Sequence, residues 1–157
     1  MSDLFEWVML AYRLPREPST RRIAVWRKLN RLGVAHLVDS LVALPADAHT
    51  KEQLEWIADE VIAAGGTASV WIAKPASAAV QRQTATLMAE TIAAEYRSVI
   101  TEAETARSAE VDGRRRAHTR LRREVERIGR RDFFPPPERE IARQAVRELG
   151  RLVEVER

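Results

Sequence analysis

The sequence predicts an α+β fold, in which a ferredoxin-like β-α-β-β-α-β sheet domain over residues 1–75 precedes an α-helical extension over residues 76–157. Three observations lead to this prediction. Strand-like and helix-like apolar patterns alternate in the first half of the chain. Prolines and glycines stand where each of these elements should end. Beyond Pro75, alanine and charged residues increase, and apolar residues recur at helical spacing.

The first two expected elements are a strand and an amphipathic helix. The strand alternates in the manner of one buried on both faces, with Phe5, Trp7, Met9 and Ala11 on one side and Val8, Leu10 and Tyr12 on the other. Pro15 and Pro18 end it. Ser19 is the expected N-cap of the helix, and Gly33 is the expected left-handed end. The apolar face of the helix should consist of Ile23, Val25, Trp26, Leu29 and Leu32.

A hairpin, a second helix and a last strand complete the expected sheet domain. Residues 34–38 and 41–44 flank the turn-forming pair Asp39-Ser40. Thr50 and Gln53 form a capping-box pattern for the second helix, which Gly65-Gly66 should end. Residues 67–74 supply the last strand, because they are rich in β-forming side chains.

Three helices are expected in the extension, at about residues 77–110, 114–130 and 137–154. Apolar residues recur at three- and four-residue steps in each of them. Asp112-Gly113 is the expected break between the first two, and residues 132–137 form a rigid connector. Pro137 suits the first position of the third helix, where no amide donor is needed.

Composition limits the classes of protein to consider. A chain of 157 residues can bury the core of one domain. No apolar run approaches the roughly 20 residues that span a bilayer, and the acidic, aromatic start does not read as a secretion signal. We therefore expect a cytoplasmic protein without membrane contact. The absence of cysteine excludes disulfides, thiolate metal sites and thiol catalysis.

The cations of this chain are almost all arginines. The formal net charge is +3, and only Lys28, Lys51 and Lys74 among the 26 basic residues are lysines. Arginine suits bidentate contacts with phosphate and other oxyanions. An arginine-rich composition can also reflect nothing more than genomic base composition, so placement carries more information than number.

The expected helix at 114–130 carries a one-sided arginine stripe. At roughly 100° per residue, the stripe covers an arc of about 100° opposite the apolar residues. Glu124 and Glu126 fall at its borders, so the stripe is uninterrupted and could bind phosphate backbones. The alternative is a solvated helix face, or one paired with acids such as Glu90, Glu95, Glu148 or Glu154. The stripe consists of Arg116, Arg120, Arg123, Arg127, Arg130 and Arg131.

A second basic cluster surrounds the first strand-to-helix turn. Backbone amides at the start of a helix would reinforce an anion site there. The cluster favours an oxyanion or nucleic-acid role, with a solvated surface as the alternative. Its members at the turn are Arg13, Arg16, Arg21 and Arg22, and those farther along the helix are Arg27, Lys28 and Arg31.

The four tryptophans are distributed one to each main element of the sheet domain, which is the pattern of a core with large anchors. We therefore predict that Trp7, Trp26, Trp56 and Trp71 belong to the core. The alternative is a stacking platform for bases, which would require exposed aromatic rings beside the basic clusters.

Catalysis has little support in the sequence. His36, His49 and His118 lie far apart and share no metal-ligand spacing. No glycine-rich phosphate loop or nucleophile elbow is present. We predict no catalytic residue, no metal site and no cofactor.

Several short motifs occur in an order that resembles one protein family. They are Pro15 to Ser19, Val25 to Leu29, Leu44 to Ala46, Gln53 to Trp56, Gly65-Gly66 and Arg131 to Phe134. Together they resemble the N-terminal domain of the chromate-resistance regulatory protein (ChrB-type) family over nearly the whole chain. The resemblance implies a regulatory part in chromate resistance. It leads us to expect a homo-oligomeric, non-enzymatic regulator that binds DNA, or chromate or another oxyanion, through its arginines.

Two other functions stay open. One is a non-catalytic interaction module that forms a homodimer or depends on a partner. The other is a metal-dependent nuclease, since the sheet domain also resembles the small CRISPR-associated nuclease fold and the C-terminal part of phenylacetate-operon repressors. Such nucleases carry an aspartate near the end of the first strand. Tyr12-Arg13-Leu14 stands there in this chain, and an arginine repels the required cation.

Overall fold

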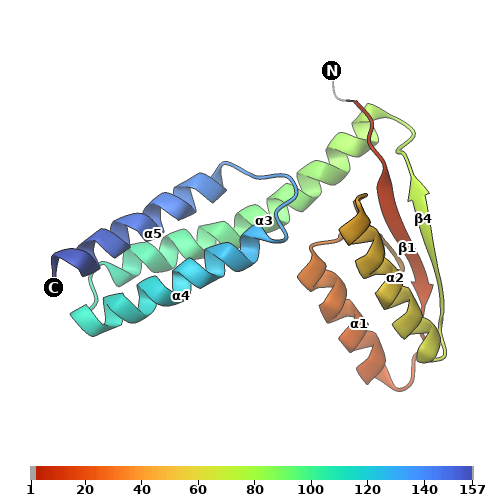
Figure 1. Cartoon of the computed structure of the whole chain (residues 1–157), viewed down its shortest axis with the longest axis horizontal. Coiled ribbons are helices and arrows are strands. Elements are labelled where there is room, and N and C mark those ends of the chain that lie inside the picture. The colour runs from red at the N-terminus through yellow and green to blue at the C-terminus, as the bar shows by residue number, and fades with distance from the viewer. Residues whose placement is uncertain (1–2, 157) are drawn as a thin grey trace. The chain divides into compact units, whose positions relative to one another are not determined.

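The computed structural model describes residues 3–156, and its elements follow the order β-α-β-β-α-β-α-α-α (Figure 1). The described chain forms two compact units, of which the first ends at Met88 and the second begins at Ala89. Helix α3 (Ala78–Ala106) begins in the first unit and ends in the second. The change of composition at Pro75 thus lies before the boundary between the units.

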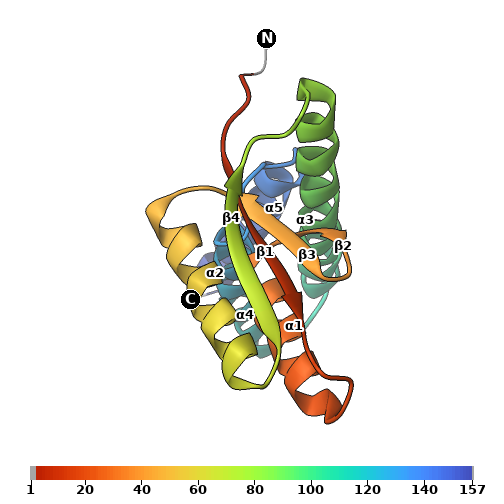
Figure 2. The ribbon, with the colours of Figure 1, turned by 90° about the vertical axis from the view of Figure 1, so that its right-hand side faces the viewer.

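The first unit is built on a four-stranded antiparallel sheet in the order β2-β3-β1-β4 (Figure 2). Strand β1 pairs along its whole length with β4, from Trp7 opposite Ala73 to Arg13 opposite Thr67. Its other side pairs with β3. The strands are β1 (Trp7–Arg13), β2 (Ala35–Val38), β3 (Leu41–Pro45) and β4 (Thr67–Ala73).

Helices α1 (Ser19–Leu32) and α2 (Ala48–Ala63) lie on one side of this sheet (Figure 1). Val8, Leu10, Val42 and Leu44 have no exposed surface, and their alternation along the strands places them on one sheet face. The predicted burial of β1 on both faces is confirmed at Trp7 and Val8, which are consecutive and therefore lie on opposite faces of the sheet. Met9, Ala11 and Tyr12 are only partly buried.

The start of α1 differs from the prediction. Pro18 occupies the N-cap position with extended backbone, Ser19 is the first helical residue, and no side chain caps the helix. The prediction of Ser19 as N-cap is therefore wrong, because the chain turns into the helix one residue earlier. The predicted end is confirmed, since Gly33 has a φ of 80° and its amide donates to the Asn30 carbonyl.

The cap of α2 also differs from the prediction. Asp47 is the N-cap, and its carboxylate accepts a hydrogen bond of 2.7 Å from the Thr50 amide. The Thr50 hydroxyl in turn accepts from the Asp47 amide at 3.0 Å. The prediction of a capping box between Thr50 and Gln53 is therefore wrong. The capping box lies three residues earlier, between Asp47 and Thr50, because the Asp47 carboxylate serves as the acceptor. These bonds hold the pKa of Asp47 below its usual range.

Three of the four tryptophans are exposed, contrary to the prediction that all belong to the core. Trp7 is 3% exposed, whereas Trp26, Trp56 and Trp71 are 55%, 64% and 60% exposed. On α1, Val25 and Leu29 are buried and Ile23 is exposed, so the contact strip is narrower than the apolar pattern suggested. Trp71 alternates with Val70 and lies on the sheet face that α1 and α2 do not cover.

A buried glutamine joins the start of the chain to α3. Gln81 is 4% exposed, and its amide oxygen accepts a hydrogen bond of 3.0 Å from the Phe5 backbone amide. The same oxygen lies 3.5 Å from the Trp7 indole nitrogen, and the amide nitrogen donates to the Asp3 carbonyl. These bonds satisfy both ends of a buried side-chain amide.

The second unit contains the rest of α3 with α4 (Val111–Gly129) and α5 (Glu138–Val155). The predicted break at Asp112-Gly113 is wrong, because both residues lie in the first turn of α4 and the chain turns at residues 107–110 instead. The Arg114 guanidinium donates to the carbonyls of Arg107 and Ala109 and thereby closes that turn. Pro137 is the N-cap of α5 rather than its first residue.

The core of the second unit includes one buried hydroxyl. Its apolar part is formed by Ile92, Val99, Leu121, Ile128, Val146 and Leu149, together with smaller side chains. Tyr96 has no exposed surface and donates a hydrogen bond of 2.8 Å to the fully buried Asp132 carboxylate. Burial, followed by this hydrogen bond, raises the pKa of Tyr96 to about 12.

Replacement of Gly66 by alanine should destabilise the first unit. A Cβ at this position would lie 2.2 Å from the Arg13 carbonyl oxygen, so the backbone of β1 or β4 would have to move. We expect a loss of about 2 kcal/mol in the free energy of unfolding, measured with urea. Gly129→Ala is the control, because nothing lies within 4 Å of the added carbon. Equal stabilities of the two variants would contradict the close approach at Gly66.

Stability should fall in strong alkali because of Tyr96. The pKa of this hydroxyl is higher in the folded chain than its ordinary value of 10.0, so its contribution is complete below pH 10 and decreases as the unfolded form ionises first. The loss between pH 10 and 12 should be on the order of 2 kcal/mol, measured by urea unfolding at several pH values. Tyr96→Phe should flatten this dependence, and an undiminished slope in that variant would refute the assignment.

Candidate functional site

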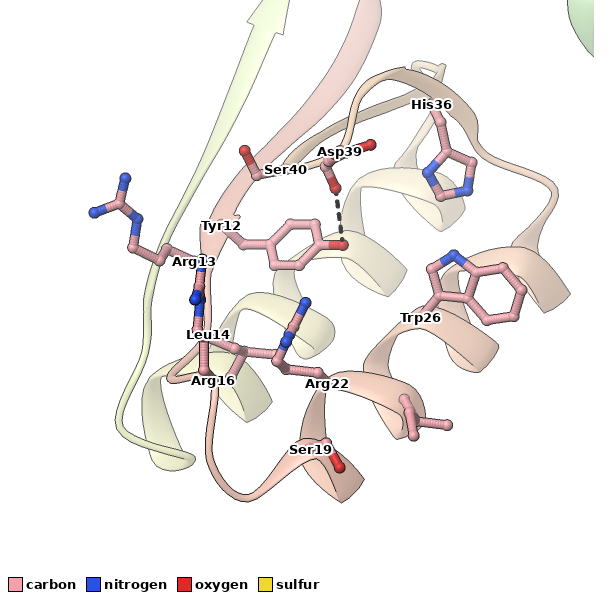
Figure 3. A pocket seen from close by; sticks show the side chains of 11 residues that line it. Tyr12, Arg13, Leu14, Arg16, Ser19, Arg22, Trp26, His36, Asp39 and Ser40 are labelled. Carbon is pink, nitrogen blue, oxygen red and sulfur yellow. Dashed lines mark hydrogen bonds between the residues drawn. The ribbon is translucent and has the colours of Figure 1, made fainter.

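The first candidate site is an open cavity of about 920 Å³ in the first unit (Figure 3). It lies where the end of β1, the start of α1 and the β2–β3 hairpin meet. We name it the Trp26 cavity. It is lined by Tyr12, Arg13, Leu14, Arg16, Ser19, Arg22, Ile23, Trp26, His36, Asp39 and Ser40.

Backbone and side-chain bonds fix the walls of the Trp26 cavity. The Tyr12 amide donates to the Ser40 carbonyl at 3.0 Å, and the Tyr12 hydroxyl donates to the Asp39 carbonyl at 3.4 Å. The hairpin turn is thereby held against the end of β1. His36 Nε2 is hydrogen-bonded to Asn30 Oδ1 at 2.9 Å, which ties the hairpin to α1.

The pKa of Tyr12 reflects both burial and the nearby charges in this cavity. Burial is the largest effect and raises the pKa of Tyr12 above its ordinary value. The positive charge of Arg22 lowers that pKa, and the negative charge of Asp39 raises it. Both charges therefore act on the same part of the cavity. Figure 3 shows Arg22 directed toward the Tyr12 ring, with Trp26 and His36 on the other side of the opening.

The structure brings together only part of the predicted basic cluster. Arg13, Arg16 and Arg22 line the cavity, although Arg13 points away from Tyr12 and Trp26 in Figure 3. The other predicted residues, Arg21, Arg27, Lys28 and Arg31, lie outside the lining. Lys28 makes an ion pair of 2.7 Å with Glu60 of α2. Among residues 3–156, the six arginines of this cluster form no ion pair.

The second candidate site is a shallow surface along α4, hollowed by about 760 Å³. Its lining contains five arginines that the sequence predicted and also Arg115, which it did not, together with Thr119, Glu124 and Glu126. We name its six arginines the α4 arginine face. They are Arg115, Arg116, Arg120, Arg123, Arg127 and Arg130.

Acidic residues neutralise part of this surface. Arg120 pairs with Glu102 of α3 at 2.6 Å, and Arg127 pairs with Glu124 of its own helix. Arg115, Arg116, Arg123 and Arg130 form no ion pair with any described residue. The stripe is thus less uniform than its sequence spacing suggested, because Glu102 reaches it from a neighbouring helix.

Arg131 stands apart from the α4 arginine face. Its side chain is 16% exposed, and Nη1 lies 2.9 Å from Glu95 Oε2 of α3. This contact is the pairing with a neighbouring helix that the sequence left open. This ion pair joins the residues after α4 to α3. It also leaves the Arg131 guanidinium fewer donors for a ligand.

The sequence also missed residues of the Trp26 cavity. The sequence pattern predicts Trp26 in the core, Asp39 and Ser40 in a turn, and Tyr12 in a buried strand. A usable signal was present on α1, since Ser19, Arg22, Ile23 and Trp26 recur at helical spacing beside the buried pair Val25 and Leu29. This second stripe faces the cavity.

Two kinds of feature are not found in the part of the chain that the structure describes. No three His, Asp or Glu side chains lie close enough to hold a metal ion. None of the described helices is sufficiently long and apolar to cross a bilayer.

Comparison with known families gives a match over most of the chain. Residues 22–155 match the family model described as "Protein ChrB, N-terminal". The chain belongs to the ChrB N-terminal family. The match confirms the resemblance to the chromate-resistance regulatory family that the short motifs indicated. It includes all of α4 and the part of the Trp26 cavity from Arg22 onward. No curated protein and no solved structure gives a significant match.

The different roles of Arg130 and Arg131 can be tested by stability. Arg131→Ala should lower the free energy of unfolding by about 1 kcal/mol, because it leaves the partly buried Glu95 without its cation. Arg130→Ala should leave stability unchanged, because Arg130 is exposed. Thermal and urea unfolding measure both. A larger loss in Arg130→Ala would reverse the assignment.

Proposed function

We propose that this ChrB-family chain is a non-enzymatic regulatory module of chromate resistance that binds DNA through the α4 arginine face. One observation supports the proposal most directly: six arginines lie along one surface of α4 and its C-cap, and four of them are free of ion pairs among the described residues. Cations in such a row attract a phosphate backbone, and arginine can contact phosphate oxygens bidentately. A cytoplasmic location and a homo-oligomeric state belong to the same proposal.

The ferredoxin-like assignment of the first unit is also part of this proposal. Its support is the β-α-β-β-α-β chain order, with the sheet order β2-β3-β1-β4 and both helices on one face. The sheet unit and the α4 arginine face then serve different tasks. The former carries a cavity, and the latter carries an extended cationic surface.

An interaction module is the second candidate function. Strand β4 is an edge strand, and its Trp71 and Ile72 are exposed. Trp56 and Ile62 of α2 are exposed as well, and α2 packs against β4. Trp71 lies on the sheet face that the helices leave open, whereas Trp56 and Ile62 belong to α2 on the other side. These are therefore two separate candidate contact surfaces.

DNA binding should depend on two arginines of the α4 face that form no ion pair. Arg116→Glu combined with Arg123→Glu should weaken binding at least about 10-fold and reduce the steepness of its salt dependence, since two phosphate contacts are replaced by repulsion. The measurement is fluorescence anisotropy with labelled DNA from the region upstream of the coding sequence and with scrambled DNA, at two salt concentrations, with and without chromate.

A charge-matched variant supplies the control for this experiment. Arg82→Glu with Arg151→Glu changes the net charge equally at exposed positions outside the α4 face. It should bind DNA nearly as the parent does, and both double variants should keep the parent's helicity by circular dichroism. Equal losses in the two variants would show that only net charge matters. If light scattering shows that the parent chain is a discrete dimer and this dimer does not bind DNA, the result would favour the interaction module.

A further inference from the structure

The lining of the Trp26 cavity combines exposed aromatic rings with cationic and acidic side chains. Trp26 lies more than half exposed on its wall, and the half-buried Tyr12 ring lies across the opening (Figure 3). Aromatic rings in such a position supply a large apolar contact area to a ligand. The indole N–H group of Trp26 makes no hydrogen bond with any residue in the described range. The ring therefore offers both a flat apolar face and a free donor.

Cations stand beside these rings without being neutralised. Arg22 lies one helical turn before Trp26 on the same face of α1, so its guanidinium and the indole border the same space. Arg16 approaches from the connection that precedes α1. Neither forms an ion pair with a described residue, whereas Lys28 on the same helix does pair with Glu60. The cavity therefore holds two unpaired cations beside its aromatic rings.

The size and polarity of the cavity argue against a bare oxyanion as its ligand. A volume of about 920 Å³ lies in the range that holds ligands of drug size and greatly exceeds a single four-oxygen anion. Asp39 also lines the cavity, and its carboxylate repels a small dianion. The same carboxylate accepts hydrogen bonds from hydroxyl or amino groups. A ligand that suits the whole lining carries an anionic group, a planar ring and hydrogen-bond donors.

We propose that the Trp26 cavity binds a nucleoside phosphate, with its base against Trp26 and its phosphate at Arg22 and Arg16. The sugar hydroxyls or base amino groups supply the donors that Asp39 accepts. The ligand is either a free mononucleotide or one nucleotide of a single strand, since both present the same groups. The proposal concerns the first unit and does not depend on DNA binding by the α4 arginine face.

The test is isothermal titration calorimetry of the full chain with adenosine 5′-monophosphate, adenosine, inorganic phosphate, chromate and hexathymidylate. We expect saturable binding of the monophosphate, with adenosine and phosphate each binding at least 10-fold more weakly. Tighter binding of hexathymidylate would identify a strand as the source of the nucleotide. Tighter binding of the monophosphate would identify a free nucleotide.

Two pairs of matched variants locate the site. Trp26→Ala and Arg22→Ala should each weaken monophosphate binding at least 10-fold. Trp56→Ala and Arg27→Ala, at exposed positions outside the cavity, should leave it unchanged. The double variant Arg116→Glu with Arg123→Glu should retain monophosphate binding even when DNA binding is lost, so the two proposals fail separately.

Three results would overturn the proposal. The first is no heat of binding with the monophosphate at millimolar concentration. The second is phosphate or chromate binding as tightly as the monophosphate, which would make the cavity a simple oxyanion site. The third is monophosphate binding that Trp26→Ala and Arg22→Ala, each shown by circular dichroism to be folded, leave unchanged.

Discussion

The pairing of β1 with neighbours on both sides is the constraint on which the first unit depends. Val8 and Leu10 are completely buried beneath the two helices, and the hydrogen-bonded partners of β1 fix the register of β3 and β4. The position of the Trp26 cavity follows from where this strand ends. Tyr12 is still paired with Ala68, whereas the chain beyond Arg13 turns toward α1. Close packing of Gly66 on the Arg13 carbonyl keeps that strand end in place.

The sequence was sufficient for features that depend on neighbouring residues in the chain. The order of the helices and strands within residues 3–156 and the left-handed end of α1 at Gly33 follow from local spacing and from glycine's access to positive φ. The helix starts were less well determined, because more than one residue near a start can take the N-cap position, with or without a side-chain hydrogen bond. Asp47 rather than Thr50 accepts the capping bond at α2, and Pro18 rather than Ser19 precedes α1.

Burial was harder to predict than secondary structure, because it depends on which side of a helix contacts the rest of the fold. On α1, Val25 and Leu29 meet the core, while Trp26 is turned toward the cavity by its position one residue away. Five residues of the α4 arginine face could be predicted, because one helix and its C-cap residue supply them. Its pairing with Glu102 could not, since that contact depends on how α3 packs beside α4.

The distribution of the indoles gives the folded chain an unusual optical property. Trp7 is enclosed, whereas Trp26, Trp56 and Trp71 are largely in contact with water. Their emission in the native state should already lie near the wavelength of hydrated tryptophan, so unfolding shifts the spectrum little. Intrinsic fluorescence therefore reports poorly on denaturation of this chain. Intrinsic fluorescence reports instead on the binding of a ligand or partner that displaces water from the exposed indoles.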